Sequence, residues 1–265
     1  MQSYDLSNRD LLKREVVRLP LQAEVLFPIE APFLKSHGVS DSCSLWDIGC
    51  GDGSWLQLFR SAFPNSAATG LDRSPEILGY ARKQNPGIPF LLVDEKNISG
   101  VLLRGEFDVA LLRFSVQHMS PDIRTRILSA LHSRKAPTRV IAIEGDDHSF
   151  VFRPRSDAVQ ALLEAKGRKQ AAQGGDRHIG SRLPELFSRL GFGLIRQDCI
   201  PINSKTIGFD TWWGLLGPVL LSGADNANSG LVDQATTWFK ENRENERALM
   251  EGSLFVVSAS NVTAS

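Results

Sequence analysis

The sequence predicts an α/β protein in which helices cover both faces of a mostly parallel β-sheet. Short β-rich runs alternate with helical patterns between residues 44 and 150, as expected when strands are connected through helices. Two of the runs, VALL at 109–112 and VIAI at 140–143, are apolar at consecutive positions. Strands covered on both faces have this pattern, so these two runs are predicted to lie at the centre of the sheet.

The first half of the chain supplies a cap and five strands. Residues 1–40 mix charged and apolar residues in an amphipathic pattern and predict an N-terminal helical cap, followed by a domain over 41–265. Ser74 and Ser120 each precede a proline, which is typical of a helix N-cap. The predicted strands are 44–49, 67–73, 89–95, 107–114 and 139–146, and the predicted helices between them include 54–63, 74–84 and 122–134.

The second half is predicted to complete the same sheet, because it contains neither an internal repeat nor a low-complexity linker. A helical insertion, about residues 203–250, precedes the last strand. The predicted elements in order are a helix at 156–173, a glycine loop at 174–180, a helix at 181–191, a strand at 192–202, helices at 206–221 and 229–245, and a strand at 253–260.

Composition excludes several classes of protein. Lys and Arg number 30 and Asp and Glu number 30, so no long-range attraction favours nucleic acid or an anionic membrane as partner. Cys43, Cys50 and Cys199 form no CxxC pair, which argues against a disulfide framework or zinc cage and favours the reducing cytoplasm. The chain has neither the apolar core of a signal peptide nor a run of about 18 apolar residues, so we expect no export and no membrane span.

A glycine-rich segment, DIGCGDG at 47–53, joins the first strand to a helix. A tight turn needs only one glycine, whereas three at alternate positions behind an acid favour a ligand that lies directly on the backbone. The lysine and hydroxyl of a P-loop are absent. The dinucleotide pattern GxGxxG would need glycine in place of Ser54 or Leu56, so dinucleotide binding is disfavoured.

This segment resembles motif I of the class I S-adenosylmethionine (SAM)-dependent methyltransferases, which reads acid-x-Gly-x-Gly-x-Gly. The resemblance implies a Rossmann-like, seven-stranded, mostly parallel sheet whose last strand is antiparallel. It implies SAM as cofactor and S-adenosylhomocysteine (SAH) as product. It also implies that the loop holds the methionine end of SAM, through Asp47, Gly49, Cys50, Gly51 and Gly53.

Acids at the ends of the next two strands complete the predicted cofactor site. Asp72, followed by Arg73, lies about 20 residues beyond the glycine loop, where a doubly wound fold places an acid that accepts from ribose hydroxyls. Its structural alternative is an acid that stabilises the N-terminus of the next helix. Asp94 resembles the family's acceptor for the adenine amino group, and Glu95 is an equally suitable acceptor by sequence.

The segment FDVALLRFSVQHM, residues 107–119, resembles the family's fourth motif. It implies that Arg113 and Phe114 lie on the cofactor side of the crevice and that Gln117 and His118 face the substrate. A hydroxyl or ammonium acceptor would need a base, and His118 is the candidate. A histidine hydrogen-bonded at a helix start is the alternative reading of His118.

A possible cation site follows the fifth strand, where His148 stands beside Asp146 and Asp147. Neighbouring residues of an extended chain point in opposite directions and rarely bind one ion together. We therefore predict no metal, and we place His148 among the substrate-binding candidates.

Two further segments supply candidate substrate residues. Arg177 and His178 lie in the loop GGDRHIG, which either closes over the substrate or only connects two helices. Trp212 and Trp213 lie in the insertion, where related methyltransferases build their substrate pockets. One tryptophan is expected to pack in the core and the other to face a planar or apolar acceptor.

The predicted function is in-line transfer of the SAM methyl group to an oxygen, nitrogen or carbon atom of a small molecule. A SAM-binding protein that performs non-methylating chemistry, or a sensor, would have the same motifs. A nucleic-acid or protein methyltransferase is less favoured, since the charge is balanced and no Asn/Asp-Pro-Pro-aromatic motif follows the fourth strand. A nicotinamide oxidoreductase is disfavoured by the missing glycine. The acceptor and the oligomeric state stay open.

Overall fold

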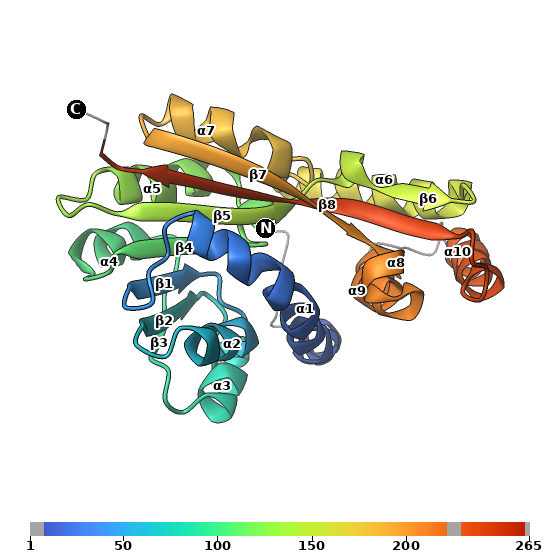
Figure 1. The fold of residues 1–265 in the computed structure, drawn as a ribbon, viewed down its shortest axis with the longest axis horizontal. Coiled ribbons are helices and arrows are strands. Elements are labelled where there is room, and N and C mark those ends of the chain that lie inside the picture. Colours follow the sequence, from blue (N-terminus) through green and yellow to red (C-terminus); the bar gives the residue numbers. More distant parts are fainter. Residues whose placement is uncertain (1–7, 222–228, 263–265) are drawn as a thin grey trace.

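A computed structural model describes residues 8–221 and 229–262. The predicted cap, insertion and C-terminal tail extend into residues 1–7, 222–228 and 263–265, which lie outside the described residues. The described chain forms one central sheet of eight strands with helices on both sides (Figure 1). None of its described helices is both long enough and apolar enough to span a membrane.

The first five strands are parallel, as predicted, in the order β3-β2-β1-β4-β5. Their carboxyl ends therefore lie at one edge of the sheet, where ligands bind in open α/β sheets. Asp47, Asp72 and Arg113 belong to this edge. The strands are β1 (Ser44–Ile48), β2 (Ala67–Asp72), β3 (Phe90–Leu92), β4 (Val109–Arg113) and β5 (Arg139–Gly145).

The last strand, β8 (Leu249–Ser260), is antiparallel to β5, which confirms the prediction. One edge of β8 pairs with β7 (Gly193–Asn203) over almost its whole length. Its other edge pairs with β6 (Val151–Arg153) at residues 249–251 and with β5 at residues 254–260. The short β6 is an eighth strand in addition to the seven predicted.

Side chains of the central strands alternate between two hydrophobic clusters, one on each face of the sheet. In β4, Val109 and Leu111 belong to one cluster and Ala110 and Leu112 to the other, as a strand buried on both faces requires. The first cluster includes residues of α1 (Arg9–Ser36), α2 (Ser54–Ala62), α3 (Pro75–Gln84), α6 (Asp157–Ala172), α9 (Phe209–Leu221) and α10 (Ser229–Asn242). The second includes residues of α4 (Ile98–Arg104), α5 (Pro121–His132) and α7 (Leu183–Arg189).

The predicted helix caps are present. The hydroxyl of Ser74 accepts from the Ile77 amide at 3.2 Å, and that of Ser120 accepts from the Ile123 amide at 3.4 Å. Each satisfies a backbone donor at the start of a helix. Short helical turns complete the described chain: η1 (Val116–His118), η2 (Asp147–Ser149), η3 (Gly180–Arg182) and α8 (Ser204–Ile207).

Helix α1 is the main element of the predicted cap. It packs against α2 and α9 and shares their hydrophobic cluster. Three prolines lie inside it, Pro20, Pro28 and Pro32, and each removes a backbone donor from the helix. Tertiary contacts therefore have to stabilise α1. The division into a cap over 1–40 and a domain over 41–265 stays a prediction.

A buried carboxylate ties α1 to the sheet. Glu30 of α1 is fully buried and accepts from the Trp55 indole at 2.7 Å. It also accepts from Nε of Arg113, with 3.0 Å to Oε1 and 2.9 Å to Oε2. Three segments that are distant in the sequence, α1, α2 and the end of β4, therefore meet at one charged group.

We expect Glu30→Ala to lower the free energy of unfolding by about 3–5 kcal/mol, because it leaves the buried Arg113 guanidinium without its anion. Urea denaturation followed by fluorescence measures this loss. Glu24→Ala makes the same change at an exposed position of the same helix and should have little effect. Equal losses in the two variants would show that the buried pair contributes nothing beyond an ordinary surface glutamate.

Candidate active site

A cavity of about 750 Å³ lies at the carboxyl edge of the parallel strands. Its walls come from the glycine loop, the ends of β1, β2, β4 and β5, and the helices α1, α6 and α9. Helix α1 contributes a stripe of residues with helical spacing, which includes Leu11, Arg14, Arg18 and Gln22. The predicted cap thus forms one wall of the cavity.

The glycine loop borders this cavity in a conformation that favours glycine. Gly49, Gly51 and Gly53 have φ of 87°, 57° and 77°, which side-chain-bearing residues rarely adopt. A Cβ atom on Gly49 would lie 2.8 Å from Cβ of Ser115. The loop amides are already used: those of Gly49 and Cys50 donate to the Leu71 carbonyl at 2.7 and 3.0 Å. The glycines therefore make room beside a ligand, and the assignment of this loop to the methionine end of SAM stays a prediction.

Asp47 has an unsatisfied acceptor at the cavity wall. Its side chain is buried, and Oδ1 has no hydrogen-bond partner among the described residues. Burial raises the pKa of Asp47 to about 7, while the nearby Arg113 opposes the shift. A cationic ligand group would stabilise the ionised form of this carboxylate. The ammonium group at the methionine end of SAM is such a group, so this corner fits the predicted cofactor.

Asp72 has both carboxylate oxygens engaged and still has acceptor capacity. Oδ2 accepts from the Gly51 amide at 3.1 Å and Oδ1 from the Ser74 amide at 2.9 Å. Burial raises the pKa of Asp72, and these two amides act against the shift. Each carboxylate oxygen can accept a second hydrogen bond. The geometry therefore fits a ribose diol, with Arg73 beside it on the cavity wall.

Asp94 and Glu95 line the same end of the cavity. Oδ1 of Asp94 accepts from the amides of Lys96 and Asn97 at 2.8 and 2.9 Å. These bonds fix the carboxylate and leave Oδ2 for a ligand donor. The assignment of either acid to the adenine amino group stays a prediction.

Arg113 and Phe114 also line the cavity. The Arg113 guanidinium lies 4.8 Å from the Phe114 ring centroid, and Glu30 holds its Nε. Phe114 has φ of 48°, a conformation that costs free energy in a residue with a side chain and is often found at functional sites. This strained residue marks the point where β4 turns into η1, above the glycine loop.

Gln117 and His118, both in η1, face the other end of the cavity together with Arg177. The pKa of His118 is lowered to about 3, mainly by burial and also by the nearby positive charges of Arg177, Lys166 and Arg18. His118 is therefore neutral at physiological pH and a weak base. Arg177 is held by Asp147 at 2.5 and 2.7 Å.

A basic helix face next to His118 was missed by the sequence analysis. Lys166, Lys169, Gln170 and Gln173 of α6 all line the cavity. Their spacing of three, four and seven residues places them on one helix face, and this pattern could have identified them. Burial lowers the pKa of Lys166 to about 8, with Arg177 as the next cause.

Glu144, at the end of β5, is a second residue that the sequence did not single out. It is fully buried, and burial raises its pKa to about 8. Its Oε1 accepts from the Val116 amide at 2.6 Å and from the Gln117 amide at 3.4 Å. Glu144 therefore holds η1, and with it Gln117 and His118, at the cavity wall.

Four predicted site residues do not line the cavity: Gly53, His148, His178 and Trp213. Trp213 instead stacks on Phe239, with 4.8 Å between ring centroids. Its neighbour Trp212 is buried, lines the cavity and donates to the Ile202 carbonyl at 3.2 Å. Trp212 is thus both packed in the core and part of the cavity wall. The roles of both tryptophans and of His148 and His178 toward a substrate stay predictions.

Comparisons with known proteins identify the domain. Residues 46–138 match the family model described as "Methyltransferase domain". A 48-residue stretch is 48% identical to trans-aconitate 2-methyltransferase of Acidovorax sp. (strain JS42), over 18% of this chain and 19% of that relative. The enzyme of the same name from Delftia acidovorans is 24% identical over 206 residues, or 77% of this chain and 65% of the relative. The chain thus spans only part of the curated relatives it matches.

Solved structures share the whole fold. Plantazolicin methyltransferase BamL, in complex with a triazolic desmethylPZN analog and SAH, has a TM-score of 0.57 at 17% identity over 97% of this chain and 93% of its own. Phosphoethanolamine N-methyltransferase 2 of Haemonchus contortus, in complex with SAM, has a TM-score of 0.57 at 14% identity, over 98% and 60%. At these identities the likeness concerns the fold.

The sheet order and the glycine loop are those of a Rossmann-like fold, and residues 46–138 match the methyltransferase domain family. Solved structures with the same fold include methyltransferases in complex with SAM or SAH.

We expect Asp72→Ala to weaken SAM binding at least about tenfold, because it removes charged acceptors for the ribose and the anchor of the Gly51 amide. Calorimetric titration with SAM and SAH measures the change, and a thermal melt checks that the variant is folded. Asp122→Ala removes an exposed acid from the first turn of α5 and should leave affinity unchanged. Wild-type affinity in Asp72→Ala would refute the ribose assignment.

Proposed function

We propose that this protein transfers the methyl group of SAM to a carboxylate oxygen of a small molecule that bears at least two carboxylates. The observation that carries the proposal is the position of Lys166 in the cavity wall beside Arg177 and His118. Lys166 is partly buried, and an ammonium whose pKa is lowered toward neutrality gains most from an anionic ligand.

The charges around this corner support an anion over a cation. Two pairs are internally balanced: Arg18 lies 2.5 Å from Glu15, and Arg177 lies 2.5 Å from Asp147. Lys166 and Lys169 of α6 bring further positive charge to this wall, and Glu15 of α1 acts on Lys166 as an opposite charge. A multiply charged carboxylate would neutralise the lysines, whereas an ammonium substrate would be repelled.

The curated relatives support the same choice, since they are named for trans-aconitate, a carboxylate. SAM supplies an activated methyl group on a sulfonium. In the transfer, the bond from the carboxylate oxygen to the methyl carbon forms as the bond from that carbon to sulfur breaks, and the electron pair stays on sulfur. A carboxylate is already ionised at neutral pH, so this acceptor needs no general base.

The reacting carboxylate loses its charge in this displacement. A cation that bound it tightly would stabilise the ground state more than the transition state and slow the reaction. Lys166 and its neighbours are therefore suited to hold a second, unreacting carboxylate, which aligns the first one with the methyl group. His118, neutral at physiological pH, is suited to hydrogen-bond the acceptor as a positioning residue. The earlier hypothesis of His118 as general base applies only to hydroxyl or amine acceptors.

The test is a screen of acceptors with purified protein, SAM and mass spectrometry of the products. We expect methyl esters from dicarboxylates and tricarboxylates, trans-aconitate among them, and at least about tenfold lower kcat/KM for matched monocarboxylates. Transfer only to amines or neutral alcohols would refute the proposal. SAM binding without transfer to any of these acceptors would favour the alternative of a SAM-binding protein with other chemistry.

The pH profile gives a second prediction with a definite sign. The pKa of Lys166 is lowered to about 8, so its charge is present below pH 8 and lost above it. If Lys166 binds the acceptor as a cation, kcat/KM should fall above pH 8 by up to about tenfold per pH unit. Lys166→Met should lower kcat/KM at pH 7 and remove this fall, whereas Lys166→Arg should remove the fall but retain binding.

A rise of kcat/KM above pH 8 in the wild type would contradict the role of Lys166 as a cation that binds the acceptor. Neutral Lys166 would then act as a general base, and the acceptor would be a group that has to lose a proton. The sign of the profile therefore decides between the two roles of this lysine.

The cytoplasm is the proposed compartment, because Cys43, Cys50 and Cys199 are all free thiols in the structure. We propose no nucleic-acid partner, in line with the balanced total charge.

A further inference from the structure

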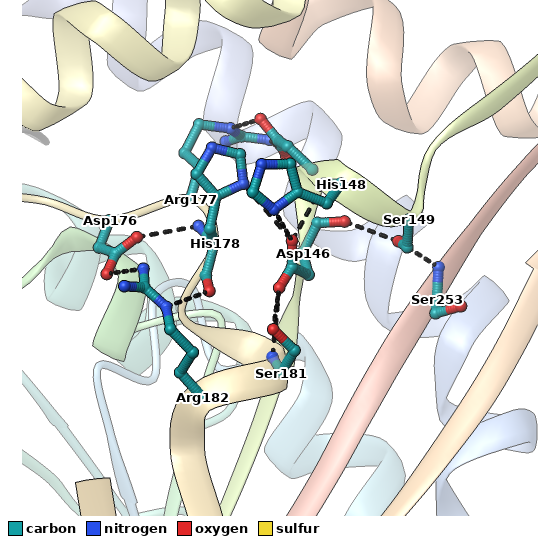
Figure 2. Close-up of polar contacts among 10 residues, drawn as sticks. Asp146, His148, Ser149, Asp176, Arg177, His178, Ser181, Arg182 and Ser253 are labelled. Atoms are coloured by element: carbon teal, nitrogen blue, oxygen red, sulfur yellow. Dashed lines mark hydrogen bonds and ion pairs between the residues drawn. The ribbon is translucent and has the colours of Figure 1, made fainter. Parts of the chain in front are cut away.

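Two loops meet beside the cavity. One follows β5 and contains Asp146 and His148. The other, between α6 and η3, contains Arg177 and His178. The amide of Asp147 donates to the carbonyl of Arg177 at 3.0 Å. Asp147 and Arg177 line the cavity, whereas Asp146, His148 and His178 do not. Figure 2 shows the side chains of Asp146, His148 and His178 close to one another.

The three gathered side chains offer convergent ligand atoms. Oδ1 of Asp146 lies 3.6 Å from Nδ1 of His148 and 3.4 Å from Nδ1 of His178. All three atoms lie within 4.8 Å of one another. Ligands about 2.1 Å from a tetrahedral zinc ion are separated by about 3.4 Å. The two distances from the Asp146 carboxylate therefore match the separation between zinc ligands.

The carboxylate is held in the orientation such a site needs. Oδ2 of Asp146 accepts from the hydroxyl of Ser181 at 2.6 Å and from its amide at 3.3 Å. Oδ1 accepts from the His148 amide at 3.0 Å and faces both imidazoles. Hydrogen bonds of this kind fix the orientation of a metal ligand. The backbone is fixed too, since Arg182 donates to the His178 carbonyl at 3.0 Å.

The imidazoles supply a second observation. Their rings stack at 3.7 Å between centroids with an angle of 12° between planes. Nδ1 of His178 is shielded from solvent and has no hydrogen bond among the described residues. It is therefore an unsatisfied nitrogen that points toward the shared carboxylate. A bound ion would satisfy it.

We propose that Asp146, His148 and His178 bind a zinc ion, with water in the fourth position. Two imidazole nitrogens and one carboxylate favour zinc and its neighbours in the first transition series over magnesium or calcium. The lone pair of an imidazole lies in the ring plane, so the two rings have to rotate out of their parallel stack to face one ion. The side chain of His148 is 78% exposed and is able to turn. Arg177 of this loop and Arg182 of η3 are each paired with a carboxylate and so oppose a dication less.

The sequence analysis predicted no metal because it considered only adjacent residues. Asp147 does turn away, as that reasoning requires, and pairs with Arg177. Asp146 and His148 lie two positions apart, and His178 comes from a loop thirty residues further on in the sequence. The ion would not touch the acceptor. It would hold together the two loops that carry the Asp147–Arg177 pair, and this role does not depend on which acceptor is methylated.

The test uses full-length protein without a histidine tag, stripped of metal with a chelator and titrated calorimetrically with Zn²⁺. We expect one zinc per chain, and at least about tenfold weaker binding in His148→Ala and in His178→Ala. His132→Ala removes a histidine of α5 that lies outside the cluster and should not change the affinity. Mg²⁺ should not compete.

Hydrogen exchange gives a readout that is independent of activity. Zn²⁺ should slow exchange of amides in residues 173–182 in the wild type and in His132→Ala, and should leave them unchanged in His148→Ala. The proposal would be overturned if stripped wild-type protein bound no zinc, or if both cluster variants bound it as tightly as the wild type. Because these measurements need neither SAM nor acceptor, their failure would not bear on the proposed methyl transfer.

Discussion

The structure depends on one buried carboxylate. Glu30 has no exposed surface, and its two oxygens accept from Trp55 and Arg113. Helix α1 contains three prolines and so depends on contacts made outside itself. The position of α1 sets one wall of the cavity. Arg113, the partner of Glu30, is also close to Asp47. Separating the two charges of a buried ion pair would leave each one buried without a partner, which is strongly destabilising. The pair therefore fixes α1 in one register.

Burial acts with opposite signs at the two ends of the cavity. At the cofactor end it raises the pKa of Asp47 to about 7. At the acceptor end it lowers the pKa of His118 to about 3 and of Lys166 to about 8. Without ligands, each end therefore holds its charges poorly. The proposed ligands, an ammonium at one end and a carboxylate at the other, would stabilise the ionised forms. On that proposal, desolvation makes both ends selective for the charge of the ligand.

Local sequence patterns were sufficient to predict the strands, helices and caps. They were insufficient to predict contacts between side chains that are distant in the sequence. Alternating strands and helices, the Ser74 and Ser120 caps and the glycine loop follow from nearby residues, and all are present. The pairing of Glu30 with Arg113 was not predictable, because neither residue carries a local signal for a partner 83 positions away. The cavity face of α6 could have been found from its spacing. The grouping of His178 with Asp146 could not, since it depends on how two loops meet beyond the sheet edge.

The antiparallel strand β8 has a consequence for the order of folding. It lies between β5 and β7 and also pairs with β6, so three strands receive hydrogen bonds from residues 249–260. While the ribosome is still translating residues 203–250, β5 and β7 have no shared neighbour and present open edges. Such edges are prone to pair with other chains. The parallel half of the sheet, with the glycine loop, can form early, whereas the antiparallel half has to wait for residues 249–260. A nascent chain of this protein would therefore need protection longest at the open edges of β5 and β7.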